Sequence, residues 1–352
     1  MMGVNIALIV GSNGLVGSSL KSYLKILPDW KYYAVSKRKP LHGNESNSIE
    51  CNLLIEKDCE KIYQKIYNST HLFYTVFKSD NDKSVEVDEN YTMLKNMVNV
   101  FIENKNQSLQ DIQLLQGSKW YGNHLGPYQT PAKEGDSRHM PPNFYFDQQE
   151  FIEKETGKNL WSWTALRPHG ICGFSVRSPM NLLNSIALYS LISKELDLPL
   201  RFPGSEKAYK KIYQATDVNL LSKAMLWAAT SKKTKNQEFN ITNGDFFRWS
   251  QIWPLIAKYF NMKLGDVQKI SLKEFMADKG PVWDDIVKKN NLIKYSYEDL
   301  VNWSFADFSF NCEYDVMSNT TKSRLYGWNE WVDSFSMFER LFDEMRKNKI
   351  IP

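Results

Sequence analysis

The sequence predicts an α/β protein in which helices cover both faces of a doubly wound parallel sheet, followed by a smaller and mainly helical lobe. Two observations predict the sheet. The first half of the 352-residue chain alternates short apolar runs with amphipathic stretches, and a glycine-rich turn follows the first apolar run. A third observation predicts the lobe, because the alternation loosens from about residue 175 into longer helical patterns and aromatic-rich segments.

The predicted strands are short runs of β-branched and aromatic residues, as expected for strands that are buried on both faces of a sheet. The clearest are residues 5–10 (Asn-Ile-Ala-Leu-Ile-Val) and 71–77 (His-Leu-Phe-Tyr-Thr-Val-Phe). Pro168 ends the last strand, because proline cannot donate a hydrogen bond to a neighbouring strand. In chain order, we expect strands over residues 5–10, 32–35, 48–53, 71–77, 112–116 and 161–167.

Helices are expected between these strands. Residues 87–104 place Met93, Met97, Val100 and Phe101 at helical spacing, and Pro28 closes the first helix. Strands that alternate with helices indicate a parallel sheet joined by crossover connections. We expect helices over residues 17–26, 59–67, 87–104 and 145–156, and later over residues 181–193 and 219–230.

The turn after the first strand has the spacing Gly-x-x-Gly-x-x-Gly over residues 11–17, the variant found in short-chain dehydrogenases. Its glycines permit a tight turn, close approach of the backbone to a pyrophosphate, and close packing of helix against strand. The helix N-terminus then offers free N–H groups to the anion. The pattern therefore predicts a Rossmann-type dinucleotide site. The residues expected at the pyrophosphate are Gly11, Asn13, Gly14, Leu15, Val16 and Gly17.

The end of the second strand indicates which nicotinamide cofactor binds. An acidic residue there accepts hydrogen bonds from the ribose 2′-hydroxyl of NAD, whereas a basic residue pairs with the 2′-phosphate of NADP. Here the sequence is Ser36-Lys37-Arg38-Lys39, without an acid. A planar guanidinium suits a phosphate, and a hydroxyl can add a hydrogen bond. The alternative is a solvated basic turn, but after a glycine turn we expect NADPH as the cofactor.

These patterns suggest a division of the chain. We expect residues 1–175 to form the NADP-binding Rossmann domain, with a return of the chain to it near residues 212–242. Residues 176–211 and 243–352 are expected to form a substrate-binding lobe that closes over the carboxyl ends of the strands, where open α/β sheets bind ligands. Several aromatic side chains of the lobe either line a pocket or pack its core, and core packing is the usual role. They are Trp249, Trp253, Trp283, Trp303, Phe305 and Phe308.

The composition excludes several classes of protein. A net charge of +4, with 42% hydrophobic and 24% charged residues, is ordinary for a soluble globular protein and gives no basic platform for nucleic acid. The four cysteines (51, 59, 172 and 312) lack metal-ligand spacing, so we expect neither a metal site nor a disulfide framework. No apolar run is long enough for a membrane helix or a signal peptide. We expect a cytoplasmic protein that binds neither nucleic acid nor membrane.

A lysine and a tyrosine are the candidate catalytic residues. Lys119 follows a predicted strand and Tyr145 begins a predicted helix, so both belong at the carboxyl edge of the sheet. An ammonium near a phenol favours the phenolate and lowers the phenol pKa from about 10. Most short-chain dehydrogenases place the lysine four residues after the tyrosine, but residue 149 is Gln. Lys119 can occupy the space that the helix lysine fills in those enzymes.

Three segments carry a specific resemblance: Gly117-Ser-Lys119-Trp-Tyr, Asn143-Phe-Tyr145-Phe-Asp, and residues 167–175 (Arg-Pro-His-Gly-Ile-Cys-Gly-Phe-Ser). They are similar to the motifs of the progesterone 5β-reductase/iridoid synthase-like family of atypical extended short-chain dehydrogenases. The similarity covers essentially the whole chain, to the stretch 322–328 near its end. It implies that Lys119 and Tyr145 form the catalytic pair. It also implies cofactor contacts by Asn52, Leu53, Val76, Phe77, Gly117 and Ile171, and a substrate pocket that includes Tyr128 and Met180.

The sequence departs from the family pattern at several positions. The second tyrosine of the Asn-Phe-Tyr motif is Phe146, and Asn52 replaces the Asp that commonly contacts adenine. Val76-Phe77 replaces a Thr-Trp pair. An insertion, residues 123–125, precedes Tyr128, which replaces a pocket phenylalanine of the plant enzymes. Because this loop shapes the pocket, the insertion and Tyr128 concern the identity of the substrate, whereas Phe146 should matter little and Asn52 can still form a hydrogen bond.

The function expected from these features is reduction of the C=C bond of an α,β-unsaturated carbonyl by 1,4-addition of hydride from NADPH. The expected partner is a small-molecule enone, and a homodimer is left open. The second reading is a carbonyl reductase or a sugar-nucleotide epimerase or dehydratase of the extended short-chain dehydrogenase class, against which the missing Tyr-x-x-x-Lys helix motif argues. The third is a non-enzymatic sensor of the NADP state, against which the Lys119–Tyr145 pair argues.

Overall fold

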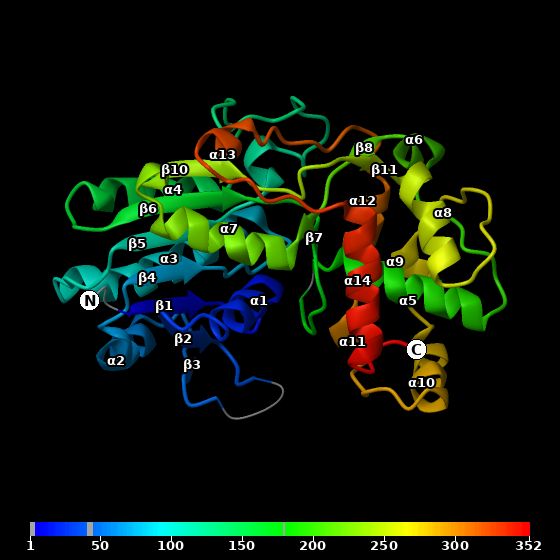
Figure 1. Ribbon diagram of the computed structural model, residues 1–352, viewed down its shortest axis with the longest axis horizontal. Coiled ribbons are helices and arrows are strands. Elements are labelled where there is room, and N and C mark those ends of the chain that lie inside the picture. The colour runs from blue at the N-terminus through cyan, green and yellow to red at the C-terminus, as the bar shows by residue number, and fades with distance from the viewer. Residues whose placement is uncertain (1–3, 41–44, 179) are drawn as a thin grey trace.

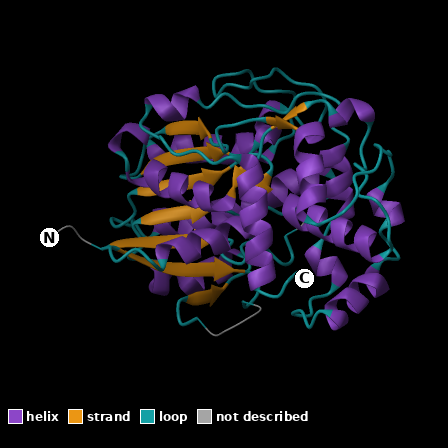
Figure 2. Ribbon diagram, turned by 45° about the vertical axis from the view of Figure 1, so that its right-hand side comes forward, coloured by secondary structure: helices purple, strands orange, loops and turns teal. Residues whose placement is uncertain are grey.

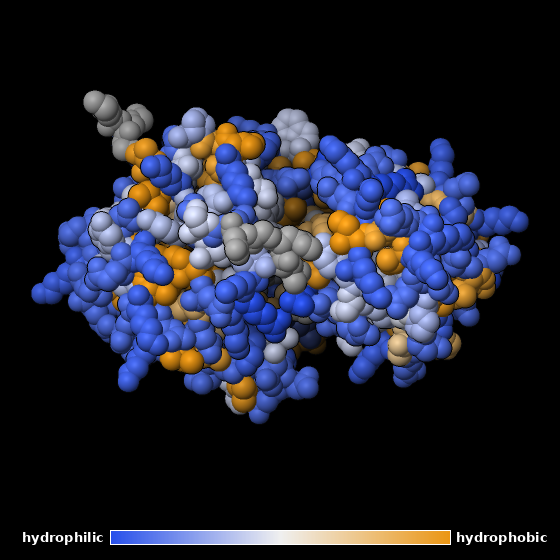
Figure 3. Space-filling model, turned by 90° about the horizontal axis from the view of Figure 1, so that it is seen from below, coloured by the Kyte–Doolittle hydropathy of each residue, from blue (hydrophilic) through white to orange (hydrophobic). Residues whose placement is uncertain are grey.

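The computed structural model describes residues 4–40, 45–178 and 180–352. Seven strands form one parallel sheet on one side of the molecule, and most helices after residue 180 gather on the other side (Figures 1 and 2). The predicted α/β fold with a doubly wound parallel sheet is confirmed. Seen from below, the surface is mainly hydrophilic with scattered hydrophobic patches (Figure 3).

The sheet has the strand order β10-β6-β5-β4-β1-β2-β3, and all its pairs are parallel. The order reverses between β1 and β4, which is the switch point where open α/β sheets bind ligands. Val10 pairs with Val35 on one side and with Tyr74 on the other, so three strands end at the same edge. The strands are β1 (Asn5–Val10), β2 (Trp30–Ser36), β3 (Ser48–Glu50), β4 (His71–Tyr74), β5 (Asp111–Leu115), β6 (Ser162–Arg167) and β10 (Gln237–Asn240).

Helices cover both faces of the sheet because successive strand residues point to opposite sides. In β1, Ala7 and Ile9 pack with two of the helices, whereas Leu8 and Val10 pack with three others. The helices on the first face are α1 (Leu15–Leu24) and α7 (Val218–Thr230), and those on the second are α2 (Glu56–Ile66), α3 (Lys83–Glu103) and α4 (Phe144–Thr156).

The carboxyl-terminal lobe has its own core. Trp249, Trp253, Trp283 and Phe310 are almost fully buried in it. Its elements are α5 (Leu182–Glu195), α6 (Glu206–Tyr209), α8 (Trp249–Tyr259), α9 (Leu272–Phe275), α10 (Gly280–Lys289), α11 (Tyr297–Leu300), α12 (Trp303–Phe310) and α14 (Ser334–Lys347), with β8 (Ile212–Tyr213) paired to β11 (Phe247–Arg248). The remaining elements are η1 (Ser118–Tyr121), β7 (Ile171–Cys172), β9 (Thr216–Asp217), η2 (Lys232–Thr234) and α13 (Thr321–Leu325).

Two predicted strands are shorter in the structure. The strand expected over 48–53 ends at Glu50, because the Asn52 carbonyl accepts a hydrogen bond from the Ile55 N–H and the chain turns into α2. The strand expected over 71–77 ends at Tyr74. Phe77 leaves the sheet and stacks on Phe144, with ring centroids 5.5 Å apart.

The chain returns to the sheet within the expected region 212–242. Helix α7 covers one face, and β10 pairs with β6 at the edge of the sheet. β8 is the exception, because it pairs with β11 outside the sheet. The division into two domains stays a prediction.

Candidate active site

The glycine turn packs closely against the end of β4. Gly11 has a φ of +92°, and a Cβ there would lie 2.7 Å from Thr75 Oγ1 and 3.1 Å from Val76 Cγ2. A Cβ on Gly17 would lie 2.4 Å from the Gly11 carbonyl oxygen, so only glycine lets α1 start this close to β1. Leu15 is buried, as is Val16 beside it, so these two residues offer a ligand only their backbone N–H groups.

The side chain of Asn13 links this turn to the end of β2. Its Nδ2 donates to Ser36 Oγ at 2.9 Å and to the Arg38 carbonyl at 2.7 Å. Ser36 Oγ in turn donates to the same carbonyl at 2.6 Å. Lys37 and Arg38 are exposed, and neither forms an ion pair within the described residues. Both cations are therefore available to an anion at this edge of the sheet.

Asn52 and Leu53 follow the next strand, β3. Asn52 is half-buried, and its Oδ1 accepts a long hydrogen bond of 3.4 Å from the Leu54 N–H. Leu53 is buried, and its carbonyl accepts from Asn96 Nδ2 at 2.9 Å. These contacts fix the turn between β3 and α2 beside the basic turn that follows β2.

Asn143 joins the predicted catalytic residues. Its Oδ1 accepts from the Tyr145 N–H at 3.0 Å and so caps the first turn of α4. Its Nδ2 donates to the Lys119 carbonyl at 2.9 Å. His139 Nε2 lies 3.0 Å from the same Nδ2 and 3.1 Å from the Lys119 carbonyl oxygen, and its Nδ1 lies 2.7 Å from the Met140 carbonyl oxygen. One amide therefore holds the turn after β5 against the start of α4.

Tyr145 is buried, and its hydroxyl faces Gly117, where a Cβ would lie 3.5 Å away. The hydroxyl makes no hydrogen bond within the described part of the chain. Burial raises the pKa of Tyr145, and the negative charge of Glu86 raises it further. The sequence suggested the opposite direction, a pKa lowered by Lys119. In the structure, burial has the largest effect on the pKa of the Tyr145 phenol, and it raises that pKa.

Lys119 lies between a carboxylate and an aromatic ring. Its Nζ is 3.5 Å from Glu86 Oε1 and 4.7 Å from the centroid of Phe77. Burial lowers the pKa of Lys119, while the charge of Glu86 opposes that effect. The ammonium is thus engaged by residues of α3 and of the segment after β4.

Gln149 stands where most short-chain dehydrogenases have the lysine. Its Oε1 accepts from Gln116 Nε2 at 3.0 Å and from Arg167 Nη2 at 3.3 Å. Arg167 is almost fully buried, and its guanidinium lies 3.7 Å from the ring centroid of Trp120. The buried guanidinium of Arg167 therefore binds neutral acceptors, and one of them, Gln149, anchors it to α4.

The other predicted site residues lie around this centre. Tyr128 is half-buried, with its ring centroid 6.4 Å from that of Tyr314, and burial raises the pKa of Tyr128. Ile171, in β7, packs against the cluster formed by α1 and α7. Met180 is 40% exposed just before α5. A contact of these three residues with cofactor or substrate stays a prediction.

Sequence reasoning missed Glu86, the bridging role of Asn143, and Arg167. Glu86 belongs to a charged run, Lys83 to Glu89, of the kind that normally marks a solvated helix face. The Asn-x-x spacing before an apolar helix start was a usable signal for the cap. Arg167 ends a buried strand, and nothing local marked it as buried.

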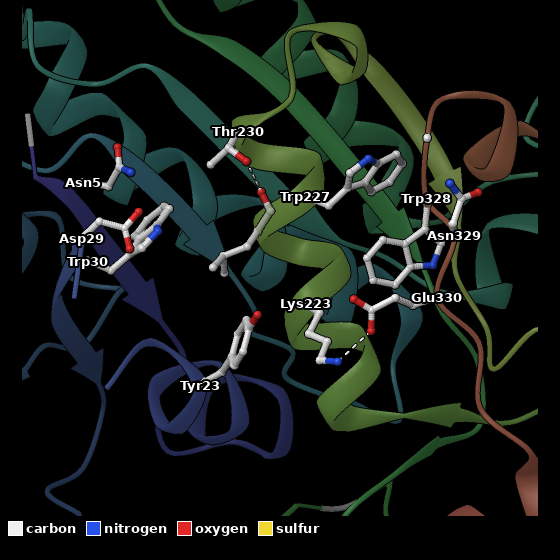
Figure 4. A pocket seen from close by; sticks show the side chains of 12 residues that line it. Asn5, Tyr23, Asp29, Trp30, Lys223, Trp227, Thr230, Trp328, Asn329 and Glu330 are labelled. Carbon is white, nitrogen blue, oxygen red and sulfur yellow. Dashed lines mark hydrogen bonds and ion pairs between the residues drawn. The ribbon is translucent and has the colours of Figure 1, made fainter. Parts of the chain in front are cut away.

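Two grooves lie outside this site. One, of about 590 Å³, lies near the amino end of β1 beside α1, α7 and the segment after α13; Trp30, Trp227 and Trp328 line it, and Lys223 pairs with Glu330 at its rim (Figure 4). The other, of about 790 Å³, runs between α3 and α4. Neither is lined by Lys119 or Tyr145.

Within residues 4–40, 45–178 and 180–352, no group of three or more His, Cys, Asp or Glu side chains is placed to hold a metal ion. In the same ranges, no helix has the length and apolar character needed to cross a membrane.

Comparison with known proteins gives a consistent picture. Residues 50–352 match the family described as PRISE-like Rossmann-fold domain. The chain is 35% identical to (S)-8-oxocitronellyl enol synthase of Catharanthus roseus, over 99% of this chain and 92% of that protein. It is 30% identical to 3-oxo-Delta(4,5)-steroid 5-beta-reductase of Arabidopsis thaliana, over 99% of this chain and 93% of that protein.

Solved structures share the fold at low sequence identity. UDP-glucose 4-epimerase of Thermotoga maritima has a TM-score of 0.70 at 14% identity, covering 97% of this chain and 99% of that one. RMD from Pseudomonas aeruginosa, complexed with NADPH, has a TM-score of 0.67 at 13% identity, covering 98% of both chains. At this identity the likeness concerns the fold alone.

Proposed function

The chain belongs to the family of PRISE-like Rossmann-fold proteins, and from this premise we propose that it is an NADPH-dependent reductase of the C=C bond of α,β-unsaturated carbonyl compounds. The observation that carries the proposal is the junction made by Asn143, which joins the Lys119 turn to the start of α4 at Tyr145. This junction stands at the carboxyl edge of the sheet, where the glycine turn also lies. Relatives named for an enol synthase and a steroid 5-beta-reductase support an enone as the substrate.

The residues of the glycine turn fit a dinucleotide. Gly11 and Gly17 leave no room for a Cβ, and the N-terminus of α1 has no acidic residue in its first turn, so its N–H groups can bind a pyrophosphate. Lys37 and Arg38 are exposed cations, without an ion pair among the described residues, that can bind a 2′-phosphate, and the absence of an acid in Ser36-Lys37-Arg38-Lys39 favours NADPH over NADH. When bound, NADPH supplies the hydride.

Tyr145 would act as a neutral hydrogen-bond donor. As hydride adds to the β-carbon of the enone, negative charge develops on the carbonyl oxygen. Because the pKa of Tyr145 is raised by burial, its phenol stays protonated at neutral pH and can donate to that oxygen throughout the step. Lys119 would add a positive charge at the same edge of the sheet.

Product analysis with a panel of enones tests this function. Enones ranging from cyclohexenone-sized to steroidal would be incubated with NADPH and, separately, with NADH, and the products separated by gas chromatography and identified by mass spectrometry. We expect the saturated carbonyl compound and a preference for NADPH. An allylic alcohol would instead identify a carbonyl reductase. If none of the enones were converted, the proposal would be refuted.

A further inference from the structure

Glu86 is a buried carboxylate whose two oxygens have different partners. Oε2 accepts from Lys83 Nζ at 2.9 Å and from the Asp80 N–H at 3.2 Å. Oε1 lies 3.5 Å from Lys119 Nζ. The side chain of Glu86 is only 6% exposed, and α3 fixes its direction from the first turn of the helix. One oxygen is therefore held by the helix start, and the other is left for Lys119.

The ammonium of Lys119 is held on two sides. Glu86 lies on one side, and the face of Phe77 lies 4.7 Å from Nζ on another. The backbone of Lys119 is fixed separately, through its carbonyl, by Asn143. The backbone and the charged end of Lys119 thus have separate anchors, and only Glu86 among them carries a negative charge.

We propose that Glu86 is a positioning residue of the reductase site, whose Oε1 holds the Lys119 ammonium in place. The proposal rests on the proposed function, because Lys119 matters for turnover only if it belongs to the reductase site. Glu86 acts on Lys119 through this contact, and its negative charge also raises the pKa of Tyr145, so a measurement on Lys119 itself is needed beside the pH profile.

The charges around Lys119 shift its pKa in opposite directions, so the direction of the shift tests the role of Glu86. The charged or titratable groups that act on Lys119 or respond to it are Glu86 and Lys83 on α3 and His124 in the loop after η1. Glu86 raises the pKa of Lys119 and Lys83 lowers it, against a background of burial that lowers it. Removal of Glu86 and removal of Lys83 should therefore move the titration of Lys119 in opposite directions.

The experiment compares pH profiles of kcat/KM for the wild type, Glu86→Gln, Glu86→Asp and Lys83→Gln. An opposite charge in contact shifts a pKa by about one unit or more, so we expect the alkaline limb of Glu86→Gln to move down by about one pH unit. Lys83→Gln should move the same limb up, and Glu86→Asp should restore part of the loss. If Glu86 served only the folding of the helix, its replacement would change the stability of the protein, but the alkaline limb would not move in opposite directions in Glu86→Gln and Lys83→Gln. An alkaline limb that stays in place in Glu86→Gln overturns the proposal.

A second measurement is independent of turnover. Lys119 would be labelled with an amine-acylating reagent over a range of pH, and its reactivity followed by peptide mass spectrometry in the same variants. We expect the half-reactive pH to fall in Glu86→Gln and to rise in Lys83→Gln. If Glu86→Gln does not fold, the labelling of Glu86→Asp and Lys83→Gln decides. Full turnover by Lys119→Met would refute the proposed catalytic pair, whereas unchanged labelling in all variants would refute the role of Glu86 alone.

Discussion

Burial acts on Tyr145 in the opposite direction to a neighbouring ammonium. The pKa of the phenol is raised because the side chain is shielded from water and because Glu86 adds a negative charge. A phenol that stays protonated is a hydrogen-bond donor over the whole neutral range. The residue therefore suits stabilisation of a developing enolate oxygen better than abstraction of a proton.

Replacing Tyr145 by Phe tests this donor. Loss of one donor to a developing oxyanion costs about 3–4 kcal/mol, so kcat with the best enone should fall by roughly two to three orders of magnitude. The Kd of NADPH, measured by fluorescence titration, should change little. Tyr91→Phe is the control, because Tyr91 also precedes a lysine by four residues but lies in the groove between α3 and α4. Near-normal turnover by Tyr145→Phe would refute the mechanism.

Arg38 is expected to select the cofactor. Its guanidinium is exposed and forms no ion pair with the residues that the structure describes, and a charge-assisted hydrogen bond to a phosphate contributes about 1.5–3 kcal/mol. Arg38→Ala should therefore raise the Kd of NADPH by roughly 10- to 100-fold while the Kd of NADH stays the same, as measured by isothermal titration calorimetry. Equal losses for the two cofactors would mean that Arg38 does not contact the 2′-phosphate.

The positions of the candidate site residues in the fold were predictable where these residues follow a local rule. Gly11 and Gly17 follow from the geometry of the turn, which leaves no room for a Cβ. Lys119 follows the end of a strand and Tyr145 lies at the start of a helix, as their positions in the sequence indicate. Glu86 was not predictable, because its burial depends on how α3 crosses the turn after β5. A charged residue on a helix reveals its partner only when the neighbouring element is placed.

At the scale of the element, Asn143 both starts α4 and holds the turn after β5. Asn143→Ala removes the cap and the bridge, so we expect the free energy of unfolding to fall by about 1–2 kcal/mol and kcat to fall as well. Asn143→Ser keeps a capping oxygen but cannot donate an amide hydrogen to the Lys119 carbonyl. It should keep most of the stability, by urea unfolding, and still lose activity. Full activity in Asn143→Ser would show that the bridge is dispensable.

Strand β5 carries a buried carboxyl that makes stability depend on pH. Burial raises the pKa of Asp111 to about 8, although the hydroxyls of Ser162 and Thr164 donate to it. In the unfolded chain Asp titrates near pH 4, so between about pH 4 and pH 8 the folded state binds a proton that the unfolded state releases. The contribution of Asp111 to stability is therefore fully present below pH 4 and is lost as pH rises to about 8.

Asp111→Asn removes this titration and keeps an acceptor for Ser162. At pH 8 the melting temperature of the variant should exceed that of the wild type. The difference in the free energy of unfolding should be about a few kcal/mol, as expected from the raised pKa of Asp111. The difference should vanish toward pH 4. A constant difference between the two proteins across this range would contradict the assignment.

The elements themselves were largely predictable. The apolar run 5–10 predicted β1 with its observed bounds, because a strand buried on both faces must be apolar throughout. The predicted ends of β3 and β4 were wrong, because the turn into α2 ends β3 and a contact with a distant part of the chain draws the residues after β4 out of the sheet. Phe77 has the strand propensity of its neighbours but stacks on Phe144 of a helix that begins far along the chain.

At the scale of the whole molecule, the sheet was predictable and the arrangement of the lobe was not. The alternation of strand and helix fixes the sheet through the handedness of its connections. The lobe is held by contacts between distant segments, such as Phe202 against both Trp253 and Phe310. Core packing of Trp249, Trp253, Trp283 and Trp303 is confirmed, whereas Phe308 is 42% exposed.

One ion pair connects the last helix of the lobe to the sheet side. Arg340 on α14 contacts Asp217, whose carboxylate is 3% exposed and whose Oδ1 accepts from the Asn219 N–H at the start of α7. Arg340→Met leaves this buried carboxylate without its cation while the helix cap remains. Because Arg340 itself is partly exposed and water can reach the contact, we expect a loss of about 1–3 kcal/mol, as a lower urea midpoint.

Lys223→Met is the matched control, because Lys223 pairs with Glu330 on the surface at 42% and 47% exposure, at the rim of the groove of Figure 4. Exposed pairs contribute about 0–1 kcal/mol, so this variant should differ little from the wild type. In an Asp217→Asn background the cap survives but the buried charge is gone, and Arg340→Met should then cost much less. An equal cost of Arg340→Met in both backgrounds would mean that α14 is held to the sheet by packing and not by this ion pair.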